Sequence, residues 1–523
     1  MTRVTAGVLA LSLAGLSVPL VTPAAGDDAA DPSVVGAFAA PFQESAVPCE
    51  EVDGRTICKP AGTSMVVLDD GRVLFWDALE GMEDADVNVV AQYGGVAQDD
   101  LARVLDVDAR QFVKPTPEDG GADRSDAPDD EKGPKPELPR NDREGNDGSM
   151  FCSDQVLLAD GRVLIAGGTS YYLEPGTDGV EYGGTELEGI RGARLFDADT
   201  DSFTQTGFMN YGRWYPSLVT QADGTVLATS GVTKLIKPVY TDEHNRGNSG
   251  RNVVQAERYD PQTGEWTVLP PSADKSLPLY PRLRLLPNGN TYYDAAGQTF
   301  NPSGQAYDEA TWNTAAVLDA ETQTWRDLGV PVIGGLPLGF RGSGFTQMLP
   351  LQPDEQGRYS TVELLSAGGV IGVTPGTYVA TDTATVNTVT IGEDGSESFA
   401  SRSVGTLNQP RWYGTGVTLP TGQVLVFNGA DKDEVVNPSS GFAVLQPEMY
   451  DPETETWTPL ASQSQERTYH NNAVLLPDGR VLVGGHSPIG SYYANQQSGQ
   501  AVKDVAGTSN PYRDTSFEVF SPP

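Results

Sequence analysis

One pattern recurs along most of the chain and limits what it can fold into. An alternating apolar run is followed by Asp-Gly or an equivalent turn, and a second apolar run ends in Gly-Gly or Gly-Ala, as in VLLADGRVLIAGGT and VLLPDGRVLVGGH. Apolar residues with period two on both sides of a tight turn are typical of a β-hairpin. Copies occur at 65–79, 152–169, 215–232, 280–297, 344–370, 413–430 and 469–486. A chain built from such copies is expected to be all-β.

A second hairpin follows most copies of the first. Its turn carries Asp-Pro or Asp-Ala and then Thr and Trp, and the instances are 193–204, 256–269, 315–328 and 447–460. Pro and Asp favour the tight turn, and the Trp is expected to pack between neighbouring units. Two hairpins make a four-stranded blade, and a unit of roughly fifty to seventy residues resembles the kelch repeat. The sequence therefore predicts a seven-bladed β-propeller with kelch-type repeats over residues 33–523.

A propeller must also close its ring, because an unpaired last blade would expose strand edges. Residues 516–521 (SFEVFS) are predicted to form the third strand of the last blade, and residues 34–42 its fourth. One stretch breaks the repeat, since residues 115–147 are dense in Asp, Glu, Lys, Pro and Gly. With little apolar surface to bury, this insert is predicted to be a mobile loop after the first blade.

The first residues of the chain predict export. Arg3 precedes an apolar run from Val8 to Val21, and the small residues Ala24 and Ala25 follow it. This pattern is typical of a secretory signal peptide over residues 1–25, so we expect a secreted, extracellular protein. The run is short for a membrane anchor and lacks a basic stop after it, and no later stretch is predicted to cross a membrane.

Charge and cysteine content narrow the classes of partner. The net charge is −37, from 71 acidic and 34 basic residues, which disfavours binding to nucleic acid or to an anionic membrane. Cys49 and Cys58 flank a short polar loop and are suited to a local disulfide in an oxidising compartment. Of the three cysteines, that pairing would leave Cys152 alone.

Residues at the hairpin starts are the candidates for function, because the innermost strands of a propeller all begin at one mouth of the central channel. Four starts are unusual: Phe151-Cys152-Ser153, Arg213-Trp214-Tyr215-Pro216, Arg411-Trp412-Tyr413-Gly414 and Arg467-Thr468-Tyr469-His470. Each also has a structural interpretation. A lone cysteine is commonly a small buried hydrophobe, and adjacent residues on a strand point to opposite faces.

Taken together, these segments resemble the copper-radical oxidases, the family of galactose oxidase and glyoxal oxidase, over nearly the whole repeat region. The Phe-Cys step is similar to the cysteine that this family links to a tyrosine. The Arg-Trp-Tyr-Pro step resembles the glyoxal-oxidase form of that tyrosine. The Tyr-His step ahead of LLPDGRV resembles the axial tyrosine and adjacent histidine of the family.

The resemblance implies a ligand set and a reaction. Cys152 would be joined by a thioether to Tyr215, which would be a copper ligand and would hold a stored radical. Tyr469 would be the axial ligand and the general base. His470 would be a further copper ligand. Imidazole and phenolate suit Cu(II). The implied cofactors are copper and the Cys-Tyr thioether radical. The implied reaction is the oxidation of primary alcohols, carbohydrate alcohols among them, or of aldehydes by O₂ to give H₂O₂.

The sequence departs from this family at its end. The family takes a further histidine ligand from a C-terminal immunoglobulin-like domain, which would begin about where this chain stops at Pro523. We therefore expect that domain to be absent or supplied by a partner chain. His244 and His486 are the candidates to replace the ligand, and His486 is preferred because its strand end should lie at the mouth that holds Tyr469 and His470.

The sequence leaves alternatives for the shielding tryptophan, for four arginines and for the function itself. The family shields its modified tyrosine with a stacked tryptophan, and since residues 231–239 contain none, Trp214 or Trp412 is the candidate. Four arginines near hairpin starts are suited either to orienting an oxygen-rich substrate or to structural ion pairs, namely Arg213, Arg282, Arg341 and Arg411. Finally, a fold does not establish a function, so the alternative is a non-catalytic kelch propeller that binds carbohydrate or protein.

Overall fold

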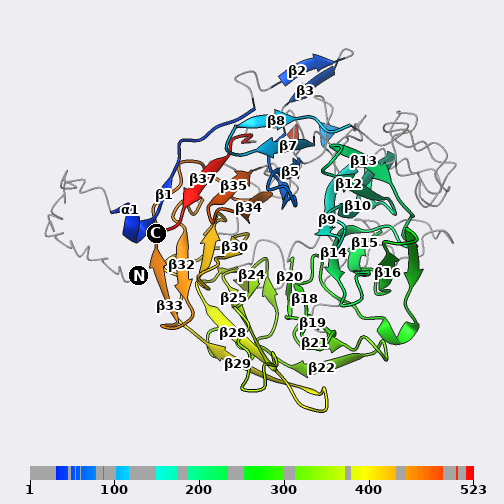
Figure 1. Cartoon of the computed structure of the whole chain (residues 1–523), viewed down its shortest axis with the longest axis vertical. Helices are drawn as coiled ribbons and strands as arrows, with labels where there is room; N and C mark the ends of the chain where they lie inside the picture. Colours follow the sequence, from blue (N-terminus) through cyan, green and yellow to red (C-terminus); the bar gives the residue numbers. More distant parts are fainter. Residues whose placement is uncertain are drawn as a thin grey trace, which may run out of the picture.

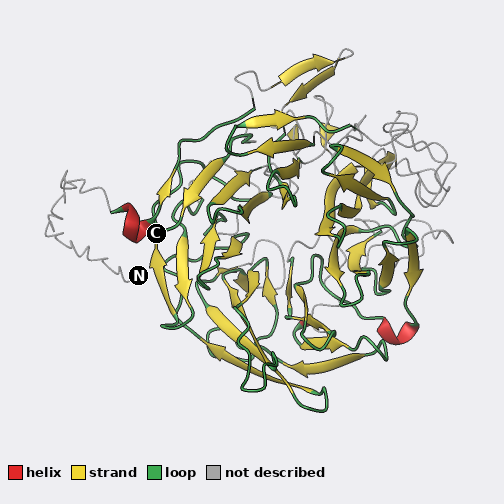
Figure 2. Ribbon diagram, in the orientation of Figure 1, coloured by secondary structure: helices red, strands yellow, loops and turns green. Residues whose placement is uncertain are grey.

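The computed structural model describes residues 31–44, 49–52, 55–58, 60–77, 86–87, 102–116, 149–173, 185–233, 252–298, 312–371, 379–431, 443–486, 502–503 and 514–523. Strands and turns dominate these ranges, and the helices α1 (Pro32–Val35) and η1 (Pro271–Ala273) are short (Figure 2). In the described ranges, no helix has the length and apolar character that a membrane crossing needs. The predicted signal peptide, His244 and all of the predicted insert beyond residue 116 lie outside these ranges.

The prediction of an all-β fold is confirmed, because antiparallel sheets stand around a central opening (Figure 1). The first sheet contains β4 (Ser64–Val67), β5 (Val73–Trp76), β7 (Arg103–Asp106) and β8 (Gln111–Val113). The second contains β9 (Ser149–Leu157), β10 (Val163–Leu173), β12 (Ala193–Asp197) and β13 (Ser202–Gln205), with β11 (Thr185–Gly189) paired to β10. The third contains β14 (Trp214–Thr220), β15 (Val226–Val232), β16 (Glu257–Asp260) and β17 (Glu265–Val268).

The following sheets repeat this order. One contains β18 (Leu283–Leu285), β19 (Thr291–Tyr293), β21 (Ala315–Leu318) and β22 (Trp325–Gly329). The next contains β24 (Phe345–Met348), β25 (Thr361–Ala367), β28 (Ala384–Ile391) and β29 (Glu397–Ser403). After it come β30 (Thr415–Thr418), β31 (Val424–Phe427), β32 (Glu448–Asp451) and β33 (Thr456–Pro459). In each sheet the first strand in the chain lies nearest the opening (Figure 1).

The sheet that contains the C-terminus is completed by the N-terminal segment, as predicted. It contains β34 (Asn471–Leu475), β35 (Val481–Gly485), β37 (Glu518–Ser521) and β1 (Ala37–Phe38). Strand β37 pairs with β35 on one side and with β1 on the other, both antiparallel. The outer strand of the last sheet therefore comes from the beginning of the chain, which joins the two ends of the ring.

Smaller pairings complete the described strands. Strands β20 (Ala296–Gly297), β23 (Arg341–Gly342), β26 (Val370–Ile371) and β27 (Val379–Ala380) form one short sheet. Strand β6 (Asp86–Val87) pairs with β36 (Val502–Lys503). Strands β2 (Cys49–Val52) and β3 (Arg55–Cys58) form a hairpin in which Cys49 and Cys58 are register partners. That register agrees with the predicted local disulfide, which remains a prediction.

All of the first hairpins predicted from the repeat are present as antiparallel strand pairs. The four predicted second hairpins are also confirmed. Two second hairpins were not predicted, β7 with β8 and β28 with β29. Both lack the Thr and Trp of three of the others, and the hairpin 193–204 itself has Phe203 in place of the Trp; the Asp-Ala and Asp-Gly turns of the two missed hairpins are present in the sequence.

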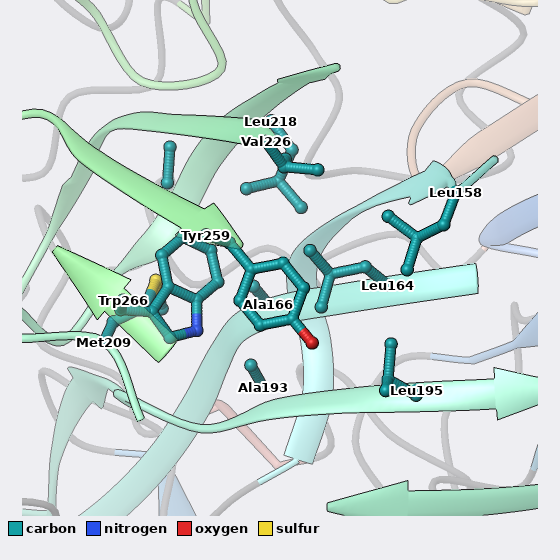
Figure 3. Packing of buried hydrophobic residues seen from close by; sticks show 11 residues of the cluster. Leu158, Leu164, Ala166, Ala193, Leu195, Met209, Leu218, Val226, Tyr259 and Trp266 are labelled. Atoms are coloured by element: carbon teal, nitrogen blue, oxygen red, sulfur yellow. The ribbon is translucent and has the colours of Figure 1, made fainter. Parts of the chain in front are cut away.

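Apolar side chains between neighbouring sheets hold the ring together. In the cluster of Figure 3, Leu164 and Leu195 of the second sheet pack with Leu218 and Tyr259 of the third. The tryptophan of the second hairpin, Trp266, lies in the same cluster with its ring 5.0 Å from that of Tyr259. The tryptophan was predicted to pack between units, and here it does. Such inter-sheet packing fixes where the innermost strands stand around the opening.

Candidate active site

A cavity of about 470 Å³ lies inside the ring. Apart from Gln298, its lining comes from the first strand of every main sheet, namely β4, β9, β14, β18, β24, β30 and β34, or from the residues just before these strands. The predicted site residues Cys152, Tyr215, Tyr469 and His470 all line it. Residues from separate repeats, up to 318 positions apart in the chain, therefore face one space.

The backbone takes an unusual conformation where these strands begin. Cys152, Tyr215, Tyr280, Tyr413 and His470 have φ values of 66°, 61°, 44°, 57° and 48°. Residues other than glycine rarely occupy this left-handed region, and each instance costs about 1–3 kcal/mol. The same departure from extended geometry recurs near the start of the first strand in five of the sheets, each time at a residue that lines the cavity. It breaks the alternation of side chains that a regular strand imposes.

The clearest consequence is at Tyr469 and His470. Adjacent residues on a strand would point to opposite faces, yet both reach Tyr215: the Tyr215 hydroxyl lies 2.8 Å from the Tyr469 hydroxyl and 3.3 Å from His470 Nε2. The Tyr469 and His470 rings are 3.9 Å apart. Because His470 is left-handed and strand β34 begins only after it, both side chains turn to the same side. The structure thus brings together three of the predicted donor groups.

Tyr215 lies between two aromatic rings. Trp214 stacks on one side at 3.7 Å with an interplanar angle of 8°, and Tyr280 at 4.4 Å with an angle of 22°. Trp214 is therefore the stacked tryptophan, whereas Trp412 stands against Tyr413. Burial, followed by the nearby Cys152, holds the pKa of Tyr215 well above its ordinary value. The phenol therefore stays neutral unless a cation stands beside it.

Cys152 is buried, with 4% of its surface exposed. It lies near enough to Tyr215 and Tyr280 to raise the pKa of both phenols, after the larger effect of burial. Cys152 belongs to the second sheet and Tyr215 to the neighbouring third sheet. The sulfur atom therefore lies beside the stack of Trp214, Tyr215 and Tyr280. The predicted partner of Cys152 is thus its neighbour in the cavity.

Arginine–glutamate pairs position the strand starts. Arg213 contacts Glu257 at 2.8 Å and Arg411 contacts Glu448 at 2.7 Å, with all four side chains at most 1% exposed. Glu448 also accepts the backbone N–H of Asn408 at 2.6 Å. Each arginine stands two residues before a cavity tyrosine, so the pair fixes the segment that delivers the aromatic side chain. Arg213 and Arg411 therefore have the structural role that the sequence left open.

The other two arginines differ from each other. Arg341 is buried and donates to the carbonyl oxygens of Gly368 and Thr383 at 2.6 and 3.0 Å. Arg282 lines the cavity. Of the four arginines considered from the sequence, Arg282 alone faces the space where a ligand would lie.

His486 is buried beside the site but does not line the cavity. Its Nδ1 accepts a hydrogen bond from the backbone N–H of Thr468 at 3.1 Å. Burial lowers the pKa of His486 to about 4, with Arg467 and His470 adding to the shift and Asp514 opposing it. Its predicted role as a metal ligand stays a prediction. Because Nδ1 accepts, Nε2 carries the hydrogen of the neutral ring, so binding of a metal at Nε2 requires the contact with Thr468 to break.

The histidine should make stability depend on pH. Because its folded pKa lies below the unfolded value, the stability that neutral His486 contributes is lost as the pH falls from about 6.5 toward 4. We expect the metal-free protein to lose about 2–3 kcal/mol through this residue between about pH 7 and about pH 4.5. In His486→Asn, whose Oδ1 can accept from Thr468, this loss should be missing in urea unfolding at both pH values. An identical pH dependence in the variant would contradict the assignment.

The residues present fit a copper ion. Two phenols and an imidazole from separate sheets converge within hydrogen-bond distance, and this N,O donor set suits Cu(II). No group of three or more His, Cys, Asp or Glu residues gathers in the described ranges in a way that could hold a metal. A metal site in this part of the chain would therefore depend on the tyrosines.

Comparison with known proteins identifies the family of the chain. The family described as glyoxal oxidase N-terminus matches residues 176–501, more than half of the chain, and the chain belongs to this family. An aldehyde oxidase of Vitis pseudoreticulata is 26% identical over 367 residues, covering 65% of this chain and 56% of that protein. A galactose oxidase of Gibberella zeae is 23% identical over 354 residues, covering 67% and 44%. The chain thus spans about half the length of these curated relatives.

The fold has a solved counterpart. A fungal alcohol oxidase of the AA5 family, in complex with copper, superimposes with a TM-score of 0.58 at 16% sequence identity, covering 94% of this chain and 77% of that one. The resemblance to the galactose oxidase and glyoxal oxidase family, first seen in three short segments, is confirmed.

Sequence reasoning missed two residues of the site. Tyr280, which covers the second face of Tyr215, begins a hairpin with the step Leu-Tyr-Pro-Arg and was not singled out. Tyr413 was noted only as a strand start, yet its ring meets that of Tyr469 at 4.6 Å and its hydroxyl accepts from Gln298 Nε2 at 2.8 Å. A comparison of the residue at each hairpin start would have found both.

Proposed function

We propose that this protein is a secreted copper-radical oxidase that converts primary alcohols or aldehydes with O₂ and releases H₂O₂. The observation that carries the proposal is the convergence of Tyr215, Tyr469, His470 and Cys152 on one cavity. The chain belongs to the family described as glyoxal oxidase N-terminus, and its relatives are an aldehyde oxidase and a galactose oxidase.

In this proposal Tyr215, Tyr469 and His470 hold the copper, with His486 as the candidate for a further ligand once its contact with Thr468 is broken. Copper supplies a one-electron store and a Lewis acid. Tyr469, 2.8 Å from Tyr215, is the general base that takes the proton of the substrate hydroxyl. For an alcohol, two electrons and two protons leave the substrate carbon and hydroxyl and convert O₂ into H₂O₂. Unchanged copper affinity in His486→Ala would remove that residue from the ligand set.

The second part of the proposed cofactor is a thioether between Cys152 and Tyr215. The bond between sulfur and a ring carbon forms as the thiol hydrogen and one ring hydrogen leave, and O₂ takes the two electrons and two protons. Trp214 and Tyr280 cover both faces of the Tyr215 ring. They would shield a radical on this ring from water and from reductants.

The architecture in this proposal is a seven-bladed kelch-type propeller over residues 33–523, with a signal peptide at residues 1–25. Support comes from the repeated four-stranded sheets around one opening and from the closing pair of β37 with β1. The innermost strands of all these sheets line one cavity, which agrees with a propeller channel. The register of Cys49 with Cys58 suits an oxidising compartment.

The thioether gives a test that does not require a known substrate. After loading with Cu(II) in air, we expect the intact protein to lose the mass of two hydrogen atoms, and a peptide pair containing Cys152 and Tyr215 to remain linked after reduction. Cys152→Ser should show neither change. The same loaded protein would then be assayed for H₂O₂ over simple primary alcohols and aldehydes.

An alternative outcome would favour the other function considered from the sequence. Should Cys152 stay free and react with an alkylating reagent in the denatured, copper-loaded protein, the oxidase proposal fails. A non-catalytic propeller that binds carbohydrate or protein would then be the better account.

A further inference from the structure

Two arginines line the cavity on the side of β18. Arg282 donates through Nε and Nη2 to the carbonyl oxygen of Gly344, at 3.3 and 3.1 Å. Arg284 donates through Nη1 to Leu283 O at 2.7 Å and through Nη2 to Thr346 O at 2.6 Å. These carbonyl contacts use only part of the donors of the two guanidinium groups. The remaining donors, and both positive charges, are available to a ligand in the cavity.

Neither arginine has a carboxylate partner within ion-pair distance in the described part of the chain. Two buried carboxylates act on these arginines from beyond ion-pair distance, Asp154, which lines the same cavity, and Asp294, and both make other hydrogen bonds. Asp154 accepts the backbone N–H groups of Leu218 and Gln155 at 2.7 and 2.9 Å. Asp294 accepts from four side chains: Tyr292, Thr346, Ser366 and Asn387.

This arrangement differs from that of Arg213 and Arg411. The chain has 71 acidic and only 34 basic residues, and other buried arginines such as Arg213 and Arg411 are matched to a glutamate. Burial, followed by the charge of Arg284, lowers the pKa of Arg282 to about 10, against the opposing effect of Asp154. An anion between the two guanidinium groups would supply the missing charge, and a carboxylate matches their planar donors.

We propose that Arg282 and Arg284 form a binding site for a small carboxylate inside the cavity. Arg282 follows Tyr280 by two residues, and Tyr280 stacks on Tyr215, so a molecule held here lies in the same space as the tyrosine pair. The carboxylate belongs either to the substrate, an aldehyde that carries an acid group, or to an acid product. That assignment rests on the proposed oxidase function, whereas the anion site itself does not.

Calorimetric titration of the copper-free full chain with acetate, at low ionic strength, tests the site directly. We expect saturable binding of acetate, and binding at least ~10-fold weaker for acetamide, which has the same shape without the charge. Arg282→Gln and Arg284→Gln should each weaken acetate at least ~10-fold, and the lysine variants less. Arg162→Gln, which removes a surface arginine paired with Asp160, is the matched control and should bind as the wild type does.

The comparison of acetate with acetamide uses the unaltered protein, so it decides the question even if a variant fails to fold. Equal binding of the two compounds, or no saturable binding of either, would overturn the proposal. Steady-state kinetics of the copper-loaded protein separate the two sources of the carboxylate. A higher kcat/KM for glyoxylate than for acetaldehyde, reversed in Arg284→Gln, assigns the site to the substrate. Competitive inhibition by acetate without that preference assigns it to the product. Acetate binding in a protein without oxidase activity would refute the proposed function and leave the anion site standing.

Discussion

Replacing Tyr469 with Phe is expected to lower the copper-dependent turnover of a primary alcohol or aldehyde by ~10²–10⁴-fold, the range that a positioned general base contributes. The hydroxyl removed lies 2.8 Å from that of Tyr215 and belongs to the proposed ligand set. Tyr215→Phe should be at least as severe, because it removes a ligand and the ring proposed to hold the radical. The measurement is the initial rate of H₂O₂ production with copper content determined on each sample.

Two comparisons make this result specific. The double variant Tyr215→Phe/Tyr469→Phe should be about as inactive as the worse single variant, because groups that act as a unit are not additive. Tyr259→Phe removes the hydroxyl of another buried tyrosine, on β16, whose oxygen lies 2.9 Å from that of Thr206. This variant should keep full activity. Tyr469→Phe with full activity at normal copper content would show that the tyrosine pair is structural.

Replacing Arg411 with Met is expected to lower the free energy of unfolding by about 3–5 kcal/mol, because it leaves the carboxylate of Glu448 buried without its partner. Both side chains are 1% exposed and 2.7 Å apart. The effect should appear in equilibrium urea unfolding as a lower midpoint with an unchanged slope. Since Arg411 stands two residues before Tyr413, a local distortion of the cavity should accompany the loss.

A second substitution at Glu448 distinguishes the effect of the buried charge on stability from the effect of lost packing. In Arg411→Met/Glu448→Gln the buried charge is gone and the amide oxygen can still accept from Asn408, so most of the lost stability should return. Arg162→Met, which breaks the exposed pair with Asp160 at 2.6 Å, should change stability by no more than ~1 kcal/mol. An Arg411 variant as mild as the Arg162 variant would mean that Glu448 is not charged in the folded protein.

The repeat made most of the fold predictable. Each Asp-Gly or Asn-Gly turn between two alternating apolar runs produces a hairpin from local chemistry alone, and the hairpins at 152–169 and 469–486 form where the pattern placed them. The closing strand at Glu518–Ser521 was also visible, because a ring without it would expose an edge. The hairpin of β28 and β29 was not predicted because its Asp-Gly turn is not followed by the Thr of the predicted second hairpins.

The site was predictable only in part. Cys152, Tyr215, Tyr469 and His470 were found through three short segments that resemble a known family, not through any local rule. Tyr280 was missed because nothing in its own segment shows that it covers Tyr215. The free charges of Arg282 and Arg284 were likewise invisible, since pairing depends on which carboxylates the fold brings near.

The sequence alone determined the strands, their turns and the order in which repeats follow one another, because these depend on residues that are neighbours in the chain. The tertiary structure decided which side chains meet at the centre. It did so through left-handed residues such as Tyr215 and His470, which cancel the alternation of a strand and turn two adjacent side chains toward one cavity. Such a conformation is stable only when packing of the surrounding sheets compensates for its strain.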